Sequence, residues 1–425
     1  MPDVHEFEKT PATVSHRINE LLIVSQYFWP ETIGSAAYIT DLAQWMAGRC
    51  ENVTVFTGRP FYPGNTIYAG YEGGKRDQEE AFDAHIIRGP TIVPKGGSFK
   101  GRLLNEALFL GNAIVSRLKG SVPRSPFVFS LCPSIFSVFA GVLSCQSTGR
   151  HIAIIHDIQS GLAAHLGMMK AGPILQILRW LERTILNRVD GIVVLSERMK
   201  ASLAEQGITV PIEVLPIWVD VESIRPMPKP PGSPPTVMYS GNLGRKQGIE
   251  QILDMASVLQ EIRPDVRILI RGSGAQADRV RQDIKTRSLN SVHLEDLVPP
   301  ERFCESLAEA DVHLVPQNPT AADFAVPSKV YSIMAAGRPF VCTALTGSTL
   351  WDLMEQAECS RCVPPNQPEQ FATSVAALLS APSVAKAMGE RGRAYVQTHA
   401  TKDAVLQRYY ELLAGSRTTP ALPTG

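Results

Sequence analysis

The stretch VPSKVYSIMAAGRPFV, residues 326–341, contains the start of a helix, its glycine end and the apolar strand that follows. Pro327 suits the first turn of a helix, and Ser328 or the residue before it can cap that turn. Lys329 then stands where the helix dipole disfavours a cation unless an anion shares the site. We therefore predict that Lys329 and this helix N-terminus bind a phosphate together, with a solvated lysine as the alternative.

Short apolar strands alternate with helical segments on both sides of a proline-rich connector, residues 224–235. Before the connector, near-continuous apolar runs such as IAIIHD and GIVVLS indicate buried parallel strands. After it the alternation restarts with TVMYSG, VRILIRGSG, VHLED, VHLVP and PFVCTA. The pattern predicts an α/β protein with two parallel-sheet domains, residues 18–223 and 236–395. A last helical segment, residues 396–415, is expected to pack back across them.

Composition excludes several classes of protein. The chain has 41 basic and 41 acidic residues, so nucleic acid is not an expected partner. Its seven cysteines are scattered, with one isolated C-x-x-C at 359–362, and no metal site is expected. Residues 1–17 lack the apolar core of a signal peptide. Pro133 and Gly141 interrupt the apolar stretch 127–145, which therefore predicts a buried strand, a turn and a helix rather than a membrane span.

Two more loops, residues 239–250 and 271–274, follow predicted strands and open helices. Their glycines allow close backbone approach to an anion, and the first loop adds two cations. Neither loop is G-x-G-x-x-G or a P-loop, so a dinucleotide oxidoreductase is unsupported. Turn glycines without a ligand are the alternative for each loop taken singly. Because ligands bind at the carboxyl ends of parallel strands, a cleft between the domains is the expected site.

The segments SGNLGRKQGIEQIL, IRGSG, ADVHLVP and PSKVYSIMAAGRPFV, in this order and spacing, resemble the donor-binding half of family 4 glycosyltransferases. VLPIWVDVESIRPM resembles the crossover between the domains of that family, and YFWPETIGSAAYITDLAQWMA its first loop and helix. The resemblance covers about residues 20–400 and is nearest to the branch that builds colanic acid and other exopolysaccharides. It implies the GT-B fold, in which two Rossmann-like parallel-sheet α/β domains face each other across a cleft.

The same resemblance implies a retaining transferase of the hexosyl type, which moves a sugar from a nucleotide-diphosphate donor to a hydroxyl. Fixed cations and helix N-termini would stabilise the leaving diphosphate. No D-x-D stands where a metal could bridge the phosphates, so no metal or other cofactor is expected. The implied acceptor is a lipid-linked saccharide. The protein is therefore expected in the cytoplasm, bound peripherally to the inner face of the plasma membrane.

The resemblance also implies functional residues. Lys329 would be catalytic, together with His156 and Asp157, which follow the strand IAII. The residues implied in donor binding are Gly34, Gly241, Asn242, Gly244, Arg245, Lys246, Gly272, Gly274, Leu297, Ser328 and Ser332. For Asp157 the alternative is a cap on the following turn, and for His156 an ordinary satisfied polar residue.

Three positions depart from the pattern of the family. Ser332 stands where many members have the glutamate that holds the ribose of the nucleotide. Asn242 stands where an arginine is frequent, and Lys246 lies one place before the usual lysine position, which is Gln247 here. These departures leave open which residue of this chain contacts the ribose. They also leave two other functions open, a GT-B epimerase acting on a nucleotide sugar and a catalytically silent nucleotide-binding partner.

The segment KGGSFKGRLLNEALFLGNAIVSRLKG, residues 95–120, is basic and has Glu106 as its one acid. Its apolar residues recur at helical spacing. Such a segment can lie in the headgroup region of a membrane with its apolar face down. The alternative is an ordinary helix that packs on its own domain.

Overall fold

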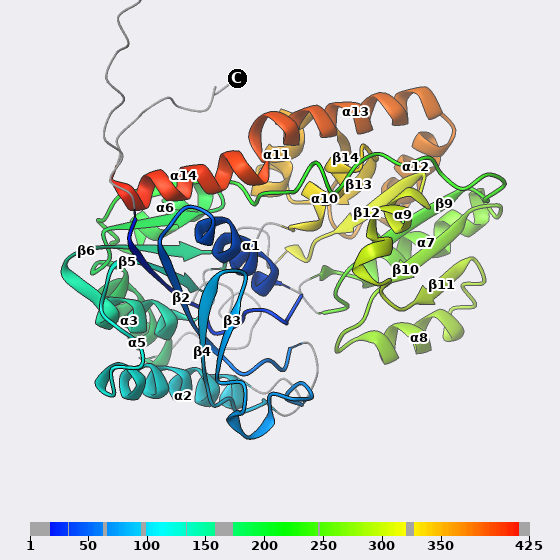
Figure 1. Cartoon of the computed structure of the whole chain (residues 1–425). Coiled ribbons are helices and arrows are strands. Elements are labelled where there is room, and N and C mark those ends of the chain that lie inside the picture. Colours follow the sequence, from blue (N-terminus) through cyan, green and yellow to red (C-terminus); the bar gives the residue numbers. More distant parts are fainter. Residues whose placement is uncertain are drawn as a thin grey trace, which may run out of the picture.

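The computed structural model of the chain describes residues 18–32, 34–62, 66–94, 99–132, 134–157, 173–244, 247–319 and 327–415. Figure 1 shows two α/β units side by side, the first coloured blue to green and the second green to orange. Each unit is built around its own sheet. The predicted α/β class, with two sheets of mainly parallel strands, is confirmed.

The first sheet has eight strands in the order β3-β4-β2-β1-β5-β6-β7-β8. They are β1 (Glu20–Val24), β2 (Asn52–Gly58), β3 (Gln78–Ala81), β4 (Ala84–Gly89), β5 (Ser125–Cys132), β6 (Cys145–Ile155), β7 (Gly191–Val194) and β8 (Ile212–Val214). All neighbours are parallel except β3 and β4, a hairpin that the sequence analysis did not predict. Its strand β3 is polar and half exposed, so it lacks the apolar run by which the other strands are recognised.

Helices α1 (Ser35–Ala47), α2 (Phe99–Leu118), α3 (Ile135–Ser144), α5 (Pro173–Leu186) and α6 (Glu197–Glu205) belong to this first unit. Residues 127–132 end β5 and residues 135–144 form α3, so the predicted strand and helix are confirmed. Pro133, where the turn was predicted, lies outside the described residues. Within the described ranges, no single helix has the length and apolarity to cross a membrane. Only together do the two helices Pro368–Leu379 and Pro382–His399, which meet at a bend of 98°, reach that length and apolarity.

The second sheet has six parallel strands in the order β11-β10-β9-β12-β13-β14. They are β9 (Thr236–Ser240), β10 (Arg267–Arg271), β11 (Val292–Glu295), β12 (Val312–Pro316), β13 (Phe340–Thr343) and β14 (Ser360–Val363). The helices are α7 (Glu250–Ile262), α8 (Ala277–Thr286), α9 (Phe303–Ala308), α10 (Lys329–Ala335), α11 (Thr349–Ala357), α12 (Pro368–Leu379) and α13 (Pro382–His399).

The strand orders fix where ligands can bind. In the second sheet the chain moves outward from β9 through β10 to β11 and then returns to the other side of β9 as β12. In the first sheet the same change of direction separates β1 from β5. Ligands of open parallel sheets bind at such switch points, outside the carboxyl ends of the strands. The loops after β9 and β12 are therefore the first place to look for a donor site.

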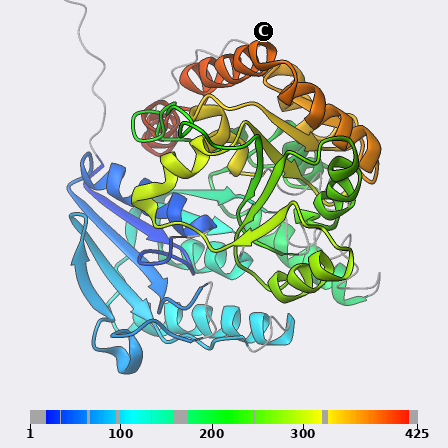
Figure 2. The ribbon, with the colours of Figure 1, turned by 90° about the vertical axis from the view of Figure 1, so that its right-hand side faces the viewer.

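The last helix, α14 (Lys402–Ala414), returns to the first unit. Asp403 accepts a hydrogen bond from Trp45 Nε1 at 2.7 Å, and Lys402 Nζ contacts Asp41 at 2.7 Å. Tyr409 and Leu413 are fully buried there. Figure 2, turned by 90°, shows the orange and red helices α13 and α14 along the same side of the molecule.

The two crossings between the units lie side by side. Val219, before the connector, donates its N–H to Ala400 O at 2.9 Å and accepts from Lys402 N at 3.0 Å. The backbone hydrogen bonds fix the two chain segments to each other where both leave one unit for the other. The hinge between the units therefore consists of two chain segments that these hydrogen bonds hold together.

Candidate functional site

Lys329 meets the loop after β9 at the switch point of the second sheet. Its Nζ lies 3.6 Å above the centroid of the Tyr239 ring. A Cβ placed on Gly241 would lie 2.9 Å from the same Nζ. The start of α10 and the loop that follows β9, far apart in sequence, thus come together.

The ammonium group of Lys329 is buried although the residue as a whole is partly exposed. Among the described residues Nζ has no hydrogen-bond partner. Burial lowers the pKa of Lys329 from 10.5 to about 7. A buried cation with only an aromatic face beside it is costly. A bound anion would remove that cost, so the arrangement favours an anion beside Lys329.

Gly272 and Gly274 let the loops after β9 and β10 pack backbone against backbone. Gly241 N donates to Arg271 O at 2.9 Å, and Leu243 N donates to Ser273 O at 2.8 Å. A Cβ on Gly272 would lie 2.0 Å from Gly241 O, and one on Gly274, at φ 150°, would lie 2.4 Å from Asn242 Oδ1. Only glycine fits these positions, because real Cβ atoms do not approach other atoms so closely.

Asn242 and Gly244 continue the loop after β9. Tyr239 Oη donates to Asn242 O at 2.6 Å, which fixes the turn from inside the domain. The Gly244 backbone lies beside Gln247, whose Oε1 would be 2.8 Å from a Cβ on Gly244. Arg245 and Lys246 lie outside the described residues.

Ser328 faces the first unit. Its hydroxyl is hydrogen-bonded to Tyr38 on α1, and burial raises the pKa of Tyr38 to about 12. The Tyr38 ring meets His156 edge-on at 6.0 Å and Trp218 at 5.4 Å between centroids. Sequence reasoning missed Tyr38, although it lies one helical turn after Gly34 in the segment that carries the resemblance.

Ser332 lies one turn beyond Ser328 on α10 and is partly exposed. If another group makes the ribose contact, Ser332→Ala should change the dissociation constant of a nucleotide less than about tenfold, or about 1.4 kcal/mol. If the serine hydroxyl makes the contact itself and is desolvated, the loss should be larger. Titration of UDP and GDP into both proteins, with Ser257→Ala on α7 as the control, separates the two cases.

Gly34 caps the start of α1 at the carboxyl end of β1. Its φ of 67° and ψ of −141° favour glycine, and nothing lies within 4 Å of the position of a Cβ. The residue is exposed, so the space beside it is open on the side of the first unit. A diphosphate could approach this backbone closely, as the resemblance implies.

Glu31, three residues before Gly34, is a buried residue that sequence reasoning missed. Its Oε1 accepts hydrogen bonds from Phe61 N and Tyr62 N, both at 2.8 Å. Burial raises the pKa of Glu31 to about 7, although these hydrogen bonds act to lower it. The carboxyl group therefore joins the loop after β1 to the loop after β2. In the sequence, Glu31 could have been recognised as a single acidic residue inside an apolar and aromatic loop.

His156 and Asp157 follow β6 directly. Burial lowers the pKa of His156 to about 4, so the imidazole is neutral at pH 7. Its Nε2 is buried and has no hydrogen-bond partner among the described residues. The carbonyl of Asp157 lies 3.8 Å from Cys132 Sγ, and the chain beyond Asp157 lies outside the described residues. A neutral imidazole beside Tyr38 can offer a hydrogen bond but not a positive charge.

Leu297, one of the residues implied in donor binding, is 39% exposed beyond the end of β11. Its neighbours line a hollow of about 620 Å³ together with buried Arg271. Arg271 is paired with Glu295 at 2.7 Å and Glu309 at 3.1 Å. These pairs neutralise the guanidinium group, and the other charged residues that line the hollow, Asp296, Arg302 and Glu305, are mostly acidic, so the hollow is not a second anion site.

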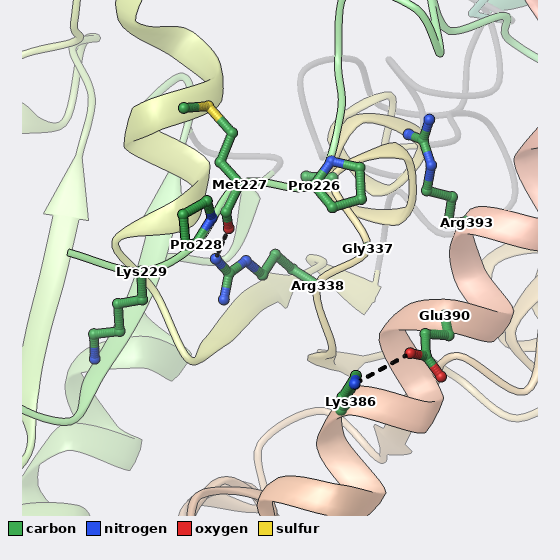
Figure 3. Close-up of a pocket in the computed structure, with 10 residues that line it drawn as sticks. Pro226, Met227, Pro228, Lys229, Gly337, Arg338, Lys386, Glu390 and Arg393 are labelled. Carbon is green, nitrogen blue, oxygen red and sulfur yellow. Dashed lines mark hydrogen bonds and ion pairs between the residues drawn. The ribbon is translucent and has the colours of Figure 1, made fainter. Parts of the chain in front are cut away.

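Figure 3 shows another hollow, of about 440 Å³, at the opposite end of α10 from Lys329. Arg338 donates to Met227 O at 2.6 Å, and Arg393 donates to Val221 O at 3.0 Å and to Ile224 O at 2.9 Å. Arg393 also donates to Ala335 O, at the end of α10. The two arginines thereby hold the connector against the helix that carries Lys329.

In the described part of the chain, no cluster of three or more His, Cys, Asp or Glu side chains could hold a metal ion. His85 pairs with Glu80 at the surface, and His151 is bonded to Ser130 in the core. Among the described residues, the cation at the switch point is Lys329.

Comparison with known proteins shows to which family this chain belongs. A model described as "Glycosyl transferase 4-like domain" matches residues 34–218, and one described as "Glycosyl transferases group 1" matches residues 220–395. The chain is 25% identical over 413 residues to a protein of Escherichia coli K12 named as the colanic acid biosynthesis glycosyl transferase WcaI. That match covers 93% of this chain and 100% of WcaI.

Solved structures share the fold. Sucrose-phosphate synthase from Thermosynechococcus elongatus matches with a TM-score of 0.73 and 19% identity, over 94% of this chain and 100% of that chain. Anabaena Alr3699/HepE in complex with UDP-glucose matches with a TM-score of 0.68 and 12% identity, over 93% and 100%. The two family models adjoin at the hinge and between them account for both units. The chain is a glycosyltransferase and belongs to family 4 of the GT-B fold, with WcaI among its relatives.

Proposed function

We propose that this glycosyltransferase moves a sugar, with retention at the anomeric carbon, from a nucleotide-diphosphate sugar to a lipid-linked saccharide during exopolysaccharide synthesis. The observation that carries the proposal is the buried ammonium group of Lys329 at the start of α10, which has no hydrogen-bond partner in the described part of the chain. The UDP-glucose complex of the fold relative HepE supports a nucleotide-sugar donor. The name of WcaI supports an exopolysaccharide product.

The proposed chemistry follows from where negative charge develops. When the bond between sugar and diphosphate breaks, the leaving oxygen gains negative charge, and Lys329 with the first N–H groups of α10 stabilises it. Ser328 and Tyr38 keep that helix end against the first unit. Asp157 is proposed to orient the hydroxyl of the acceptor. This chemistry requires neither a metal nor another cofactor, because lysine supplies the cation.

Incubation with a panel of UDP- and GDP-sugars and a lipid-linked saccharide tests the proposal. The expected result is release of nucleoside diphosphate together with an extended glycan. Inversion of the donor sugar without transfer would instead support the epimerase. Nucleotide binding without any turnover would support the silent partner.

Helices α2 and α5 support the further proposal that the enzyme works at the inner face of the plasma membrane. Leu104, Leu118 and Trp180 are 57%, 82% and 54% exposed. Figure 1 shows α2, α3 and α5 together at one end of the first unit, and α3 contacts both other helices. The inward face of α2 holds Phe109 and Ala113. Helix α2 thus packs on its own domain and still presents leucines outward.

The charges on this surface have one sign. Glu106 and Glu182, the only acids in the sequences of α2 and α5, are both buried. Lys119, Arg179 and Arg183 are exposed. Exposed leucine and tryptophan among cations fit the headgroup region of an anionic bilayer. We call the exposed residues Leu103, Leu104, Val115, Leu118, Ile177 and Trp180 with these three cations the α2–α5 surface.

Vesicle flotation tests whether the α2–α5 surface binds a membrane. Replacing Leu104, Leu118 and Trp180 with serine should weaken binding to anionic vesicles about tenfold or more, because each loses apolar area that the bilayer would bury. Lys119, Arg179 and Arg183 changed to glutamine should remove the dependence on salt. Ile262→Ser with Val384→Ser, exposed on the second unit, is the matched control. Absence of wild-type flotation, or equal binding to neutral vesicles, would contradict this mode of binding.

A further inference from the structure

Cys342 and Cys362 face each other on the last two strands of the second sheet. Their sulfur atoms lie 2.8 Å apart, and the residues are direct partners in the parallel register of β13 and β14. Neighbouring strands are about 4.8 Å apart, and disulfide-bonded cysteines have Cα atoms about 4.4–6.8 Å apart. The two thiols therefore already have the backbone spacing of a disulfide.

We propose that Cys342 and Cys362 form a reversible intramolecular disulfide by exchange with a small-molecule disulfide such as oxidised glutathione. Cys362 is partly exposed on the edge strand, whereas Cys342 is fully buried. The small disulfide can therefore reach Cys362 first, and Cys342 acts from within the protein. The proposal is independent of the proposed sugar transfer.

The exchange proceeds in two balanced steps. The Cys362 thiolate attacks one sulfur of oxidised glutathione, forms a mixed disulfide and expels one glutathione thiolate, which takes up a proton. Cys342 then loses its proton and attacks the Cys362 sulfur, so that the protein disulfide forms and the second glutathione leaves. Two protein thiols are oxidised by two electrons, and one small disulfide is reduced to two thiols. Burial raises the pKa of the Cys342 thiol, so the second step should be the slower.

Cys359 is the competing partner, because it forms a C-x-x-C pair with Cys362. Its sulfur contacts Met354 Sδ at 3.9 Å, and its Cβ would lie 3.1 Å from a Cβ placed on Gly392. Burial raises the pKa of the Cys359 thiol to about 12. Cys359 is thus enclosed between α11 and α13, whereas Cys342 is already in contact with Cys362.

Thiol mapping tests the proposal. The full chain and its Cys359→Ser, Cys342→Ser and Cys362→Ser variants are equilibrated in buffers of increasing oxidised-to-reduced glutathione ratio, quenched in acid, alkylated and analysed by mass spectrometry. Wild type and Cys359→Ser should each lose two reactive thiols and yield a peptide linked through residues 342 and 362. Cys342→Ser should retain one glutathione on Cys362, because the resolving thiol is missing. Cys362→Ser should retain the Cys342 thiol reduced.

The wild-type protein also gives a readout that needs no variant. Its oxidised form should have a higher midpoint of thermal unfolding, because the bond ties the edge strand β14 to β13 and constrains the unfolded chain. Addition of reductant should reverse the shift. Retention of both thiols at every glutathione ratio, or a link between residues 359 and 362 in the wild type, would overturn the proposal.

Discussion

Lys329→Ala should lower turnover on the nucleotide-sugar donor by about 100-fold or more, by analogy with the removal of a transition-state hydrogen-bond donor. The lysine is the described cation at the switch point, and its ammonium group has no other described hydrogen-bond partner to retain. The variant should fold, because removal of a buried charge near a helix N-terminus removes an unfavourable interaction. Steady-state kinetics and circular dichroism check both expectations.

Lys386→Ala, on α13 beside the hollow at the other end of α10, is the matched control and should retain activity. Near-normal turnover of Lys329→Ala would contradict the phosphate assignment. A loss of helical structure in the variant would instead assign Lys329 a structural role.

The same lysine predicts a pH dependence of nucleotide binding. Its pKa in the free protein is about 7, so above pH 7 the amine is largely neutral and binding a diphosphate requires uptake of a proton. The affinity for UDP should therefore fall by up to about tenfold per pH unit from pH 7 to 9. Of its titratable neighbours, His313 and Tyr239 do not titrate in this window, because burial lowers the pKa of His313 to about 4 and raises that of Tyr239. Calorimetry in buffers of different ionisation enthalpy measures the proton, and Lys329→Met should abolish the uptake.

Gly272→Ala should weaken nucleotide binding about tenfold or more and lower the free energy of unfolding by about 1–3 kcal/mol. Its Cβ would lie 2.0 Å from Gly241 O, a backbone atom that cannot turn aside as a side chain can. The loops after β9 and β10 would have to separate, which moves Gly241 away from Lys329. Titration of UDP and urea denaturation measure the two effects.

Gly111→Ala is the control for a glycine without such a neighbour. It lies on α2, where nothing stands within 4 Å of the added Cβ, so the substitution should be neutral or stabilising. Equal effects of Gly272→Ala and Gly111→Ala on nucleotide binding would contradict the close packing of the two loops.

Residue patterns alone predict the α/β class, most buried strands and the position of Lys329 at a helix start. These features are local, since an apolar run or a proline before a lysine acts through its immediate neighbours in the chain. The hairpin of β3 and β4 escaped because its polar edge strand is paired on one side only and has no buried face to leave an apolar pattern. The order of the strands had no local signal either. The last helical segment was expected to pack back across the domains, but only the structure shows that α14 lies on the first unit.

The contacts between residues that are far apart in the sequence are seen only in the folded chain. Tyr38 meets Ser328 across the two units, and the Tyr239 ring lies beneath the Lys329 ammonium group, because the switch point brings their loops to one edge of the sheets. Burial then lowers the pKa of Lys329 and of His156, a change that depends on every atom that excludes water and on no single neighbour in sequence. The lysine could be found in the sequence, but its low pKa and its aromatic neighbour exist only in the folded chain.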